Sequence, residues 1–255
     1  MRRSHRIHPD YLAQEEDIHK LVETFDTRGS EIGDQDRNTL KSVDLNGQSI
    51  VIKSFRIPNL INRIAYRFFR KSKALRSFEH ACKLQSLGIG TPAPIACYEF
   101  TTPFFFKRSF YISRHVDADL TYRNLTEDLN YPDHEKILRA FTGFTYELHQ
   151  KGIKFLDHSP GNTLIRVFKH GYEFYLVDLN RMAFKEMKPD ERIRNFERLT
   201  PHQSVVRIMS EEYAKLIDWD ADEVFRKMWK NTEAFQTRFH RRRRLKKRLK
   251  FWKRS

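Results

Sequence analysis

Residues 156–178, LDHSPGNTLIRVFKHGYEFYLVD, combine two short apolar runs with polar side chains at their ends. The runs are rich in Ile, Val, Tyr and Phe and are separated by a Lys-His-Gly turn, a pattern that predicts a β-hairpin. Paired strands lie about 5 Å apart, so Asn162 before the first strand and Asp178 after the second should be neighbours. The two side chains can then share a metal ion, and Asp157 is left to face a substrate.

This set of side chains is the one that phosphoryl transfer needs: an Asp that accepts a hydroxyl proton, and an Asn and a second Asp that hold magnesium on the phosphates. The D-x-x-x-x-N spacing from Asp157 to Asn162 resembles the catalytic loop of protein-kinase-like folds. The strings FLDHSPGNTLI and YLVDLNRMAF resemble more closely the lipopolysaccharide kinase (Kdo/WaaP, InaA-type) family of bacteria. The likeness runs from about residue 37 to 185. An ordinary polar turn with a strand-ending Asp is the alternative interpretation.

The resemblance implies an α+β, two-lobed protein-kinase-like fold with a small antiparallel β-rich N-lobe and a mainly helical C-lobe. A chain of 255 residues is long enough for two such lobes. We expect the N-lobe at 1–115, with a basic helical insertion at about 60–73. The C-lobe is expected at 116–240 and a basic tail at 241–255.

Composition and cysteine usage indicate where the protein works. The chain is 39% hydrophobic and 32% charged, which suits a soluble globular protein. No apolar run approaches the roughly 20 residues of a membrane span, and the first residues carry charge without the apolar core of a secretory signal. Cys82 and Cys97 do not have a metal-ligand spacing and are expected as thiols in a reducing compartment. A cytoplasmic location is therefore favoured.

The excess positive charge is concentrated at the C-terminus. The last fifteen residues hold ten Lys and Arg and no acid, so only +5 of the net charge of +15 belongs to the rest of the chain. Such a run can bind a membrane surface or nucleic acid, or can be a solvated tail. Leu245, Leu249, Phe251 and Trp252 lie between the cations, and such groups can enter a lipid interface. This favours peripheral contact with an anionic membrane and disfavours nucleic acid as a partner.

A second hairpin is predicted at 39–55, TLKSVDLNGQSIVIKSF, because the Asn46-Gly47 pair separates two strand-like segments. Side chains alternate along a strand, so Lys53 shares a face with Val51. That face can line a nucleotide cleft while the other face packs on the lobe. The string IVIK resembles the third strand of kinase-like folds, whose Lys binds the ATP phosphates and a helix Glu. The resemblance thus implies that Lys53 and Val51 contact ATP.

The Glu partner of Lys53 is predicted in SKALRSFEHACKLQSLGIGTP, residues 72–92, which has apolar residues at helical spacing. Glu79 lies in the middle of this helix, 26 residues after Lys53. The gap is longer than in protein kinases and includes IPNLINRIAYRFFRKSK. This insertion has an apolar face and several cations, so it is either a second contact with glycolipid or a helix packed on the small lobe.

Three departures from protein kinases bear on the acceptor. Phe155 and Leu156 stand where His-Arg usually precedes the catalytic Asp, and no Ala-Pro-Glu follows Asp178. The Arg that commonly contacts a phosphorylated activation loop is missing, which favours constitutive activity on a small or glycolipid acceptor. Gly29 and Gly33 precede the first hairpin, but G-x-G-x-x-G is absent, so the usual glycine-rich loop over the phosphates is not predicted.

Two further segments complete the predicted lobes. Residues 91–116 predict two strands, and the backbone of 114–116 would bond adenine if the resemblance holds. Residues 133–152 predict a core helix that delivers the chain to Asp157. His149 on this helix is expected to be packed in the core and not catalytic.

The resemblance implies an ATP-dependent, Mg²⁺-dependent kinase that phosphorylates a Kdo or heptose hydroxyl of the lipopolysaccharide inner core at the cytoplasmic membrane face. Asp157 would orient or deprotonate the hydroxyl, Asn162 and Asp178 would bind Mg²⁺, and Lys53, held by Glu79, would bind ATP. Two alternatives are a protein Ser/Thr kinase, which shares every catalytic residue, and a catalytically inert, kinase-like membrane or nucleic-acid adaptor. Glycolipid phosphorylation argues against the first, and magnesium-dependent ATP binding against the second.

Overall fold

The computed structural model describes residues 1–32 and 38–252, with side chains described as far as residue 246. The chain forms two compact units, which are described separately. Unit 1 comprises Met1–Asp117 and Tyr175–Arg181, and unit 2 comprises Ala118–Phe174 and Met182–Ser255. The short segment 175–181, which contains Asp178, therefore belongs to the same unit as Lys53, although the chain on both sides of it belongs to unit 2.

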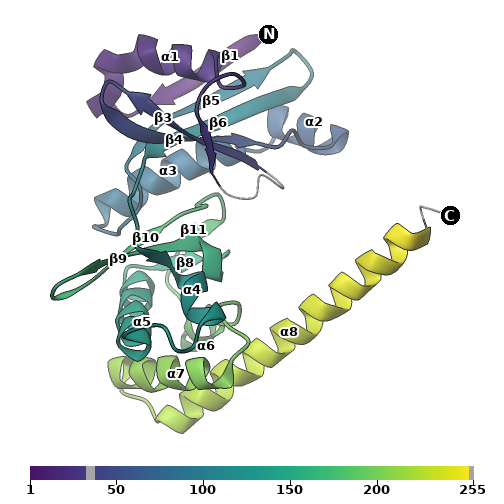
Figure 1. The fold of residues 1–255 in the computed structure, drawn as a ribbon. Coiled ribbons are helices and arrows are strands. Elements are labelled where there is room, and N and C mark those ends of the chain that lie inside the picture. The colour runs from purple at the N-terminus through teal and green to yellow at the C-terminus, as the bar shows by residue number, and fades with distance from the viewer. Residues whose placement is uncertain (33–37, 253–255) are drawn as a thin grey trace. The chain divides into compact units, whose positions relative to one another are not determined.

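Unit 1 is built on a six-stranded sheet with the order β1-β5-β6-β4-β3-β2 (Figure 1). All of its neighbouring strands are antiparallel. Asn46 and Gly47, with φ of 53° and 83°, form the tight turn between β3 and β4, which confirms that hairpin. The strands are β1 (Arg2–Ile7), β2 (Ser30–Ile32), β3 (Asn38–Leu45), β4 (Gln48–Phe55), β5 (Pro94–Thr101) and β6 (Phe106–Arg114).

Unit 1 also contains four helical segments among its described residues. They are the 3-10 helix η1 (Pro9–Gln14) and the α-helices α1 (Glu15–Glu23), α2 (Leu60–Phe68) and α3 (Lys73–Ser86). Ile18 of α1 packs in one cluster with Ile50 and Ile52, the buried face of β4. The predicted insertion at 60–73 is α2, which ends at Phe68, and Lys73 begins α3 after the N-cap residue Ser72. Gly33 lies outside the described residues, and Gly29 directly precedes β2.

Unit 2 is mainly helical and contains two small sheets, with the orders β10-β9-β7 and β11-β8. The strands β9 and β10 are neighbours, which confirms the hairpin predicted from the sequence. The elements are β7 (Leu120–Thr121), α4 (Tyr122–Glu127), α5 (His134–Gln150), β8 (Ile153–Phe155), η2 (Pro160–Asn162), β9 (Thr163–Phe168), β10 (Gly171–Leu176), β11 (Met182–Phe184), α6 (Pro189–Arg194), α7 (Gln203–Ile217) and α8 (Ala221–Trp252).

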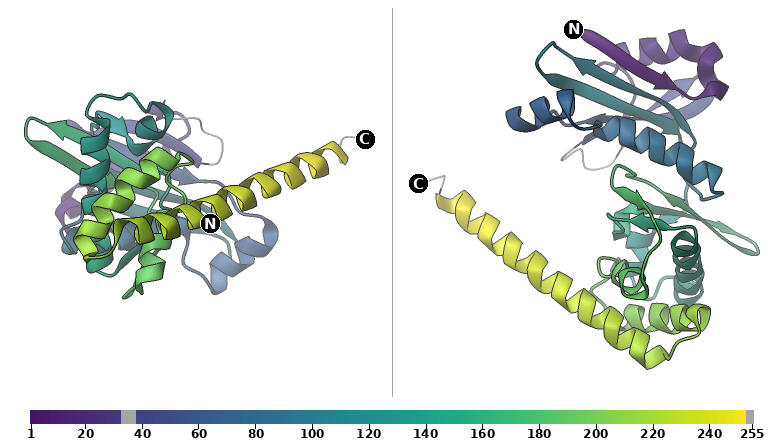
Figure 2. Two further views of the ribbon diagram at one scale, coloured as in Figure 1. Left: turned by 90° about the horizontal axis from the view of Figure 1, so that it is seen from below. Right: turned by 180° about the vertical axis from the view of Figure 1, so that it is seen from behind.

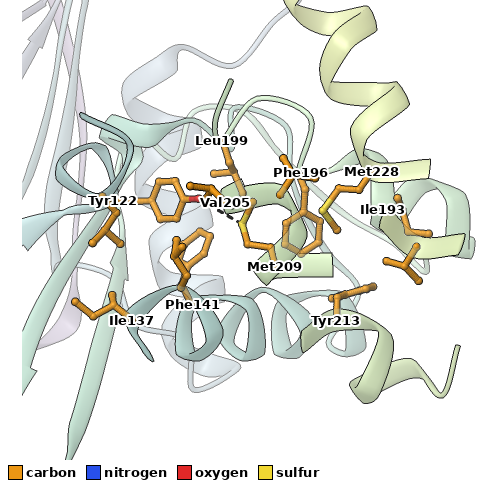
Figure 3. Close-up of a cluster of buried hydrophobic side chains, with 14 of the residues drawn as sticks. Tyr122, Ile137, Phe141, Ile193, Phe196, Leu199, Val205, Met209, Tyr213 and Met228 are labelled. Atoms are coloured by element: carbon orange, nitrogen blue, oxygen red, sulfur yellow. Dashed lines mark hydrogen bonds between the residues drawn. The ribbon is translucent and has the colours of Figure 1, made fainter. Parts of the chain in front are cut away.

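The core of unit 2 lies between α5, α7 and the first part of α8 (Figure 3). Phe141 and Tyr213 are fully buried there, and the hydroxyl of Tyr122 donates to Sδ of Met209 at 3.3 Å. Helix α5 carries the apolar stripe that the sequence predicts for 133–152. The core fixes the start of α8 and the C-terminal end of α5, from which the chain continues into β8 and the loop with Asp157.

The second half of α8 leaves this core. Figures 1 and 2 show it extending beyond α6 and α7 of its own unit, and residues 237–246 are all exposed. The predicted basic tail is therefore, as far as residue 252, a continuation of α8, and residues 253–255 lie outside the described part. In the described chain, none of the helices combines the length and the apolar character needed to cross a membrane.

Candidate functional site

Unit 1 brings together two residues predicted for the site. Nζ of Lys53, on β4, lies 2.7 Å from Oδ1 of Asp178. The ammonium group also lies 5.3 Å from the centre of the Phe55 ring. Val51 lies two residues before Lys53 and is half-buried, as expected for a position lining a cleft. The lysine is thus placed to bind an anion from the sheet, with a carboxylate as its partner in this structure.

The segment that carries Asp178 is tied to unit 1 by backbone and side-chain hydrogen bonds. Thr91 donates its hydroxyl to the carbonyl of Leu176 at 2.9 Å, and Nδ1 of His80, on α3, lies 2.6 Å from the carbonyl of Leu179. Asp178 itself has a φ of 57°. Asp and Asn are among the few residues that adopt this left-handed conformation readily, so the local backbone suits the residue found here.

Electrostatics keep the Asp178 carboxylate ionised. Burial alone would raise its pKa, but the charge of Lys53 and hydrogen bonds from Lys53 and Asn180 lower it overall, with Lys73 adding to the effect. Nδ2 of Asn180 donates to the same oxygen, Oδ1, at 2.7 Å. Since both hydrogen bonds reach Oδ1, Oδ2 is the atom through which Asp178 can bind a cation.

The structure differs from the prediction for Glu79. Its carboxylate binds Nζ of Lys71 at 2.8 Å and the guanidinium of Arg6 at 3.0 Å, and Lys53 instead contacts Asp178. Glu79 lies on α3 as predicted, but Lys71, just before that helix, and Arg6, on β1, supply the compensating charge. The prediction of a Lys53–Glu79 ion pair is therefore wrong for this structure.

Lys73 is a further cation near Asp178 that the sequence analysis did not assign to the site. Burial lowers its pKa, and the charge of Asp178 opposes this shift. The same lysine lines a pocket of about 480 Å³ next to α2, together with Phe55, Arg56, Tyr66 and Phe106. Lys73 could not be singled out from the sequence because it lies in a run of cations.

The helix α2 turns its cations towards the sheet and its apolar side chains outwards. Nε of Arg63 donates to the carbonyl of Phe106 at 3.2 Å, and Nε of Arg67 donates to the carbonyl of Thr102 at 3.0 Å. We define the α2 apolar surface by large side chains that are 40% or more exposed, with Arg70 and Lys71 also exposed nearby. Its members are Ile57 49%, Leu60 57%, Ile61 79%, Ile64 40%, Phe68 54% and Phe69 82%.

Unit 2 holds the other two predicted residues in one loop. Nδ2 of Asn162 donates to the backbone carbonyl of Asp157 at 2.8 Å and to Oγ of Ser159 at 3.0 Å. These bonds fix the amide so that its Oδ1 is the atom presented for a cation. The loop is short because the 3-10 helix η2 folds the chain back immediately before β9. The contact predicted between Asn162 and Asp178 involves one residue of each unit, and it stays a prediction.

Arg198 is a site residue that sequence reasoning missed. Its Nη1 lies 2.9 Å from Oδ1 of Asp157 and donates to the carbonyl of Leu156 at 3.1 Å. Its guanidinium also lies 5.4 Å from the centre of the Phe235 ring on α8. No Arg directly precedes Asp157 in the sequence, and the loop between α6 and α7 supplies a cation to it instead. Arg198 lies 41 residues after Asp157, so no short sequence motif indicates this contact.

The strand before Asp157 is held by buried polar contacts. Nδ2 of Asn195 donates to the carbonyl of Phe155 at 2.8 Å, and Oδ1 of Asn195 lies 3.2 Å from Nε2 of His149. Nδ1 of His149 lies 2.8 Å from the hydroxyl of Tyr213. Burial lowers the pKa of His149 to about 4, so the ring is neutral at pH 7. His149 is thus a packed residue, as predicted, and it supports the loop indirectly.

Arg123, on α4, lies against the loop that carries Asp157 and Asn162. A Cβ atom placed on Gly161 would lie 2.9 Å from Nη2 of Arg123. The absence of a side chain at this position lets the guanidinium approach the backbone of η2. An arginine beside a loop with Asp157 and Asn162 is suited to an anionic group on an acceptor.

The donor atoms of the two predicted metal ligands are of the type that Mg²⁺ prefers. Asp178 offers a carboxylate oxygen and Asn162 an amide oxygen, and Mg²⁺ prefers oxygen ligands, usually one or two from the protein with phosphate oxygens and water completing the set.

The backbone N–H groups of Arg114 and His115, proposed for adenine, instead donate to the carbonyls of Ala93 and Ser49 within unit 1. The adenine contact predicted for 114–116 therefore stays a prediction for the carbonyl groups of these residues and for Val116.

Comparison with known proteins identifies the family. A model described as "Lipopolysaccharide kinase (Kdo/WaaP) family" matches residues 16–224. The chain belongs to this family. The lipopolysaccharide kinase is similar to the solved structure "WaaP in complex with acyl carrier protein", with a TM-score of 0.62 and 14% identity over 94% of this chain and 99% of that chain. No curated protein matches the sequence.

These findings confirm the resemblance seen in the sequence and the α+β, kinase-like two-lobed fold. At 14% identity, the likeness to WaaP concerns the fold. Family membership makes the protein a phosphotransferase that acts on a sugar hydroxyl in lipopolysaccharide biosynthesis, with ATP as the phosphoryl donor.

Proposed function

We propose that this kinase transfers the γ-phosphoryl group of ATP to a hydroxyl of a Kdo or heptose residue in the lipopolysaccharide inner core, at the cytoplasmic face of the membrane. The observation that supports this most directly is the Lys53–Asp178 ion pair at 2.7 Å in a chain of this family. A lysine and a carboxylate in contact on one unit are the groups expected to bind opposite charges of a metal–nucleotide complex.

Each residue has a defined part in the proposed reaction. Lys53 would bind phosphate oxygens, and Val51 would line the nucleotide site. Asp178 and Asn162 would hold Mg²⁺ with their side-chain oxygens, and the ion would neutralise phosphate charge. Asp157 accepts a hydrogen bond from the acceptor hydroxyl and takes its proton as the oxygen bonds to the γ-phosphorus, while the bond from that phosphorus to the β,γ-bridging oxygen breaks and ADP leaves. Because the Arg198 guanidinium holds one oxygen of Asp157, the carboxylate has a fixed orientation towards the hydroxyl.

Acceptor phosphorylation tests this proposal. The purified kinase would be incubated with ATP, Mg²⁺ and core glycolipids ending either in Kdo or in heptose, and the products analysed by mass spectrometry. We expect one acceptor class to gain a phosphate, and the Asp157→Asn variant to lose the transfer. Transfer to a protein acceptor with no glycolipid product, or unchanged transfer by Asp157→Asn, would contradict the assignment.

The membrane location is supported by the α2 apolar surface. Six large apolar side chains with exposures of 40–82% project from one short segment, and Arg70 and Lys71 lie at its end. Apolar groups can enter the lipid interface while cations meet anionic head groups, each worth about 1 kcal/mol. The exposed cations of α8 between Arg241 and Lys246 add positive charge on unit 2.

Vesicle binding tests this location. We expect the kinase to sediment with vesicles that contain phosphatidylglycerol and to bind neutral phosphatidylcholine vesicles at least tenfold more weakly. The double variant Ile61→Ser/Phe69→Ser should lose most of the binding. The matched control is Leu12→Ser, which removes a side chain of η1 that is 56% exposed. Equal binding by the double variant, or binding of acyl carrier protein and not vesicles at this surface, would contradict membrane docking.

A further inference from the structure

A histidine-rich cluster lies in unit 1 between β1 and α1. His5 comes from β1, and Glu15 and His19 lie four residues apart on α1, so they share one face of that helix. β1 is an edge strand of the six-stranded sheet and pairs with β5 alone. The catalytic residues do not include any of these three side chains.

The potential ligand atoms lie at distances that suit one small cation. Nε2 of His5 is 2.9 Å from Oε1 of Glu15, and Nε2 of His19 is 3.9 Å from the same oxygen. All three ligand atoms lie within 4.8 Å of one another. In a tetrahedral zinc site with bonds of about 2.0–2.1 Å, two ligand atoms are about 3.3 Å apart. Small side-chain rotations would therefore bring the three atoms to this spacing.

Two polar atoms of the cluster's surroundings have no hydrogen-bond partner among the described residues. They are Nε2 of His19 and the hydroxyl of Tyr98, and both are buried. The Tyr98 ring, which is 0% exposed, lies 5.4 Å from the His5 ring and 5.3 Å from the His19 ring. An unpartnered buried nitrogen costs folding free energy, so a ligand on Nε2 of His19 removes a penalty.

Charge and protonation are compatible with a cation. Burial lowers the pKa of His19, with Arg3 and His5 adding to the effect and Glu15 and Glu23 opposing it. The neutral imidazole is the form that binds metal. Arg3, whose positive charge acts on His19, is bound to Glu23 at 2.9 Å, so its repulsion of a second cation is partly compensated.

We propose that His5, Glu15 and His19 form a site for a divalent transition metal of the Zn²⁺ class, with water as a fourth ligand. Imidazole nitrogens with one carboxylate oxygen favour Zn²⁺ and disfavour Mg²⁺, which prefers oxygen ligands. The ion links the edge strand β1 to α1 and stabilises unit 1. This site is separate from the residues proposed to bind the magnesium–ATP complex.

Zinc titration of the full chain, without an affinity tag and after treatment with a chelator, tests the site. Binding would be measured by competition with a chromophoric chelator and by metal analysis after gel filtration. We expect one Zn²⁺ per chain to be lost, or bound at least tenfold more weakly, in the His19→Gln variant. Zinc should raise the melting temperature of the wild-type protein and not that of His19→Gln. An excess of Mg²⁺ should not displace the ion.

Matched variants keep the result interpretable. His170→Gln removes an exposed histidine at the β9–β10 turn, and Asp178→Asn removes a proposed magnesium ligand, so both should keep the zinc. Glu15→Gln, at a side chain that is 40% exposed, serves as a second variant if His19→Gln fails to fold by circular dichroism. Zinc binding by His19→Gln or Glu15→Gln within twofold of the wild type, or no zinc on the wild-type chain at micromolar concentration, overturns the proposal.

Discussion

Each unit pairs a carboxylate that we propose for the active site with a cation, but the two pairs are built differently. In unit 1, Asp178 contacts Lys53 at 2.7 Å, and their side chains are 29% and 14% exposed. In unit 2, Asp157 contacts Arg198 at 2.9 Å, with exposures of 20% and 31%. Lys53 has a flexible stem and a single charged group, whereas the planar guanidinium of Arg198 binds two partners at once.

As a consequence, we expect the Lys53–Asp178 pair to be able to exchange its partners and the Asp157–Arg198 pair to be fixed. Arg198 also donates to the Leu156 carbonyl and packs on the Phe235 ring, so it remains in place when a substrate approaches Asp157. Lys53 has Asp178 as its charged partner in this structure, and each of them is proposed to move to a charge on the nucleotide complex. With these proposed roles, the pair in unit 1 would rearrange when the ligand binds, and the pair in unit 2 would present an orientated base.

Asp157→Asn should have the largest effect on activity. The amide keeps the shape of the side chain but cannot accept a proton, and loss of a general base costs about 10²–10⁴ in kcat. Glycolipid phosphorylation under saturating ATP measures this. Asp222→Asn, at an exposed carboxylate of the same unit, is the control and should be unchanged. A loss below fivefold would show that Asp157 does not have the proposed role.

Lys53→Met should destabilise the protein by about 1–3 kcal/mol at pH 7, because it leaves the partly buried Asp178 carboxylate without its charged partner. The pKa of folded Asp178 is lowered, so the stability from the pair is present above the ordinary carboxyl pKa of about 3.9 and is lost as the pH falls through the lowered value. Urea unfolding at pH 7 and at low pH measures the difference between variant and wild type.

The control for Lys53→Met is Lys20→Met, which removes an exposed lysine 3.8 Å from Asp17 on α1. An exposed pair of this kind contributes about 0–1 kcal/mol. Protonated Asp178 is neutral and does not form an ion pair with Lys53, so the variant should be less destabilised at low pH. Equal destabilisation by Lys53→Met at the two pH values would contradict the role given to this ion pair.

Arg198→Lys should lower kcat by about tenfold, which corresponds to about 1.4 kcal/mol, with little change in the KM for ATP. Lysine keeps the charge but cannot bind Asp157 and the Leu156 carbonyl with one planar group, so the base is held less firmly. Steady-state kinetics with both substrates measure kcat and the KM for ATP separately. Arg238→Lys, whose guanidinium binds Glu197 nearby, is the control. An effect confined to the KM for ATP would place Arg198 in nucleotide binding.

Gly161→Ala should have the smallest effect, below about 1 kcal/mol in stability, because the methyl group meets the flexible end of Arg123 and not backbone. The displaced guanidinium should raise the KM for the glycolipid acceptor by a few-fold. Acceptor titrations measure it, and Gly171→Ala, where a Cβ meets no atom within 4 Å, is the control. An equal change in the two variants would exclude Arg123 from acceptor binding.

Local patterns predicted much of the fold. Asn46-Gly47 marked the β3–β4 hairpin, and the helical spacing of Phe78, Ala81 and Leu84 marked α3 with Glu79 on it. These features depend on neighbouring residues, whose geometry repeats with a fixed period. The six-strand order and the edge position of β1 depend on partners distant in sequence and were not predicted. The apolar face of α2 was predicted, but the sequence left open whether it faces outwards or packs on the lobe.

The candidate site divides in the same way. Lys53, Asp157, Asn162 and Asp178 were predicted because family motifs place them on strands and loops of fixed order. Arg198 and His80 were missed because each reaches its partner across a fold that no short spacing encodes. The prediction of a Lys53–Glu79 pair was wrong for a related reason. Glu79 binds Lys71 and Arg6 instead, and no sequence motif indicates these two contacts.

With the roles proposed for Lys53 and Asp178, nucleotide binding would exchange the partners of an existing ion pair. Lys53 would lose a carboxylate and gain a phosphate, and Asp178 would lose an ammonium and gain a divalent metal, so few new charge pairs would be created relative to those broken. Salt screens the starting pair and the final pairs alike. The affinity for magnesium–ATP should therefore depend only weakly on ionic strength, and the resting enzyme keeps both charges compensated between catalytic cycles.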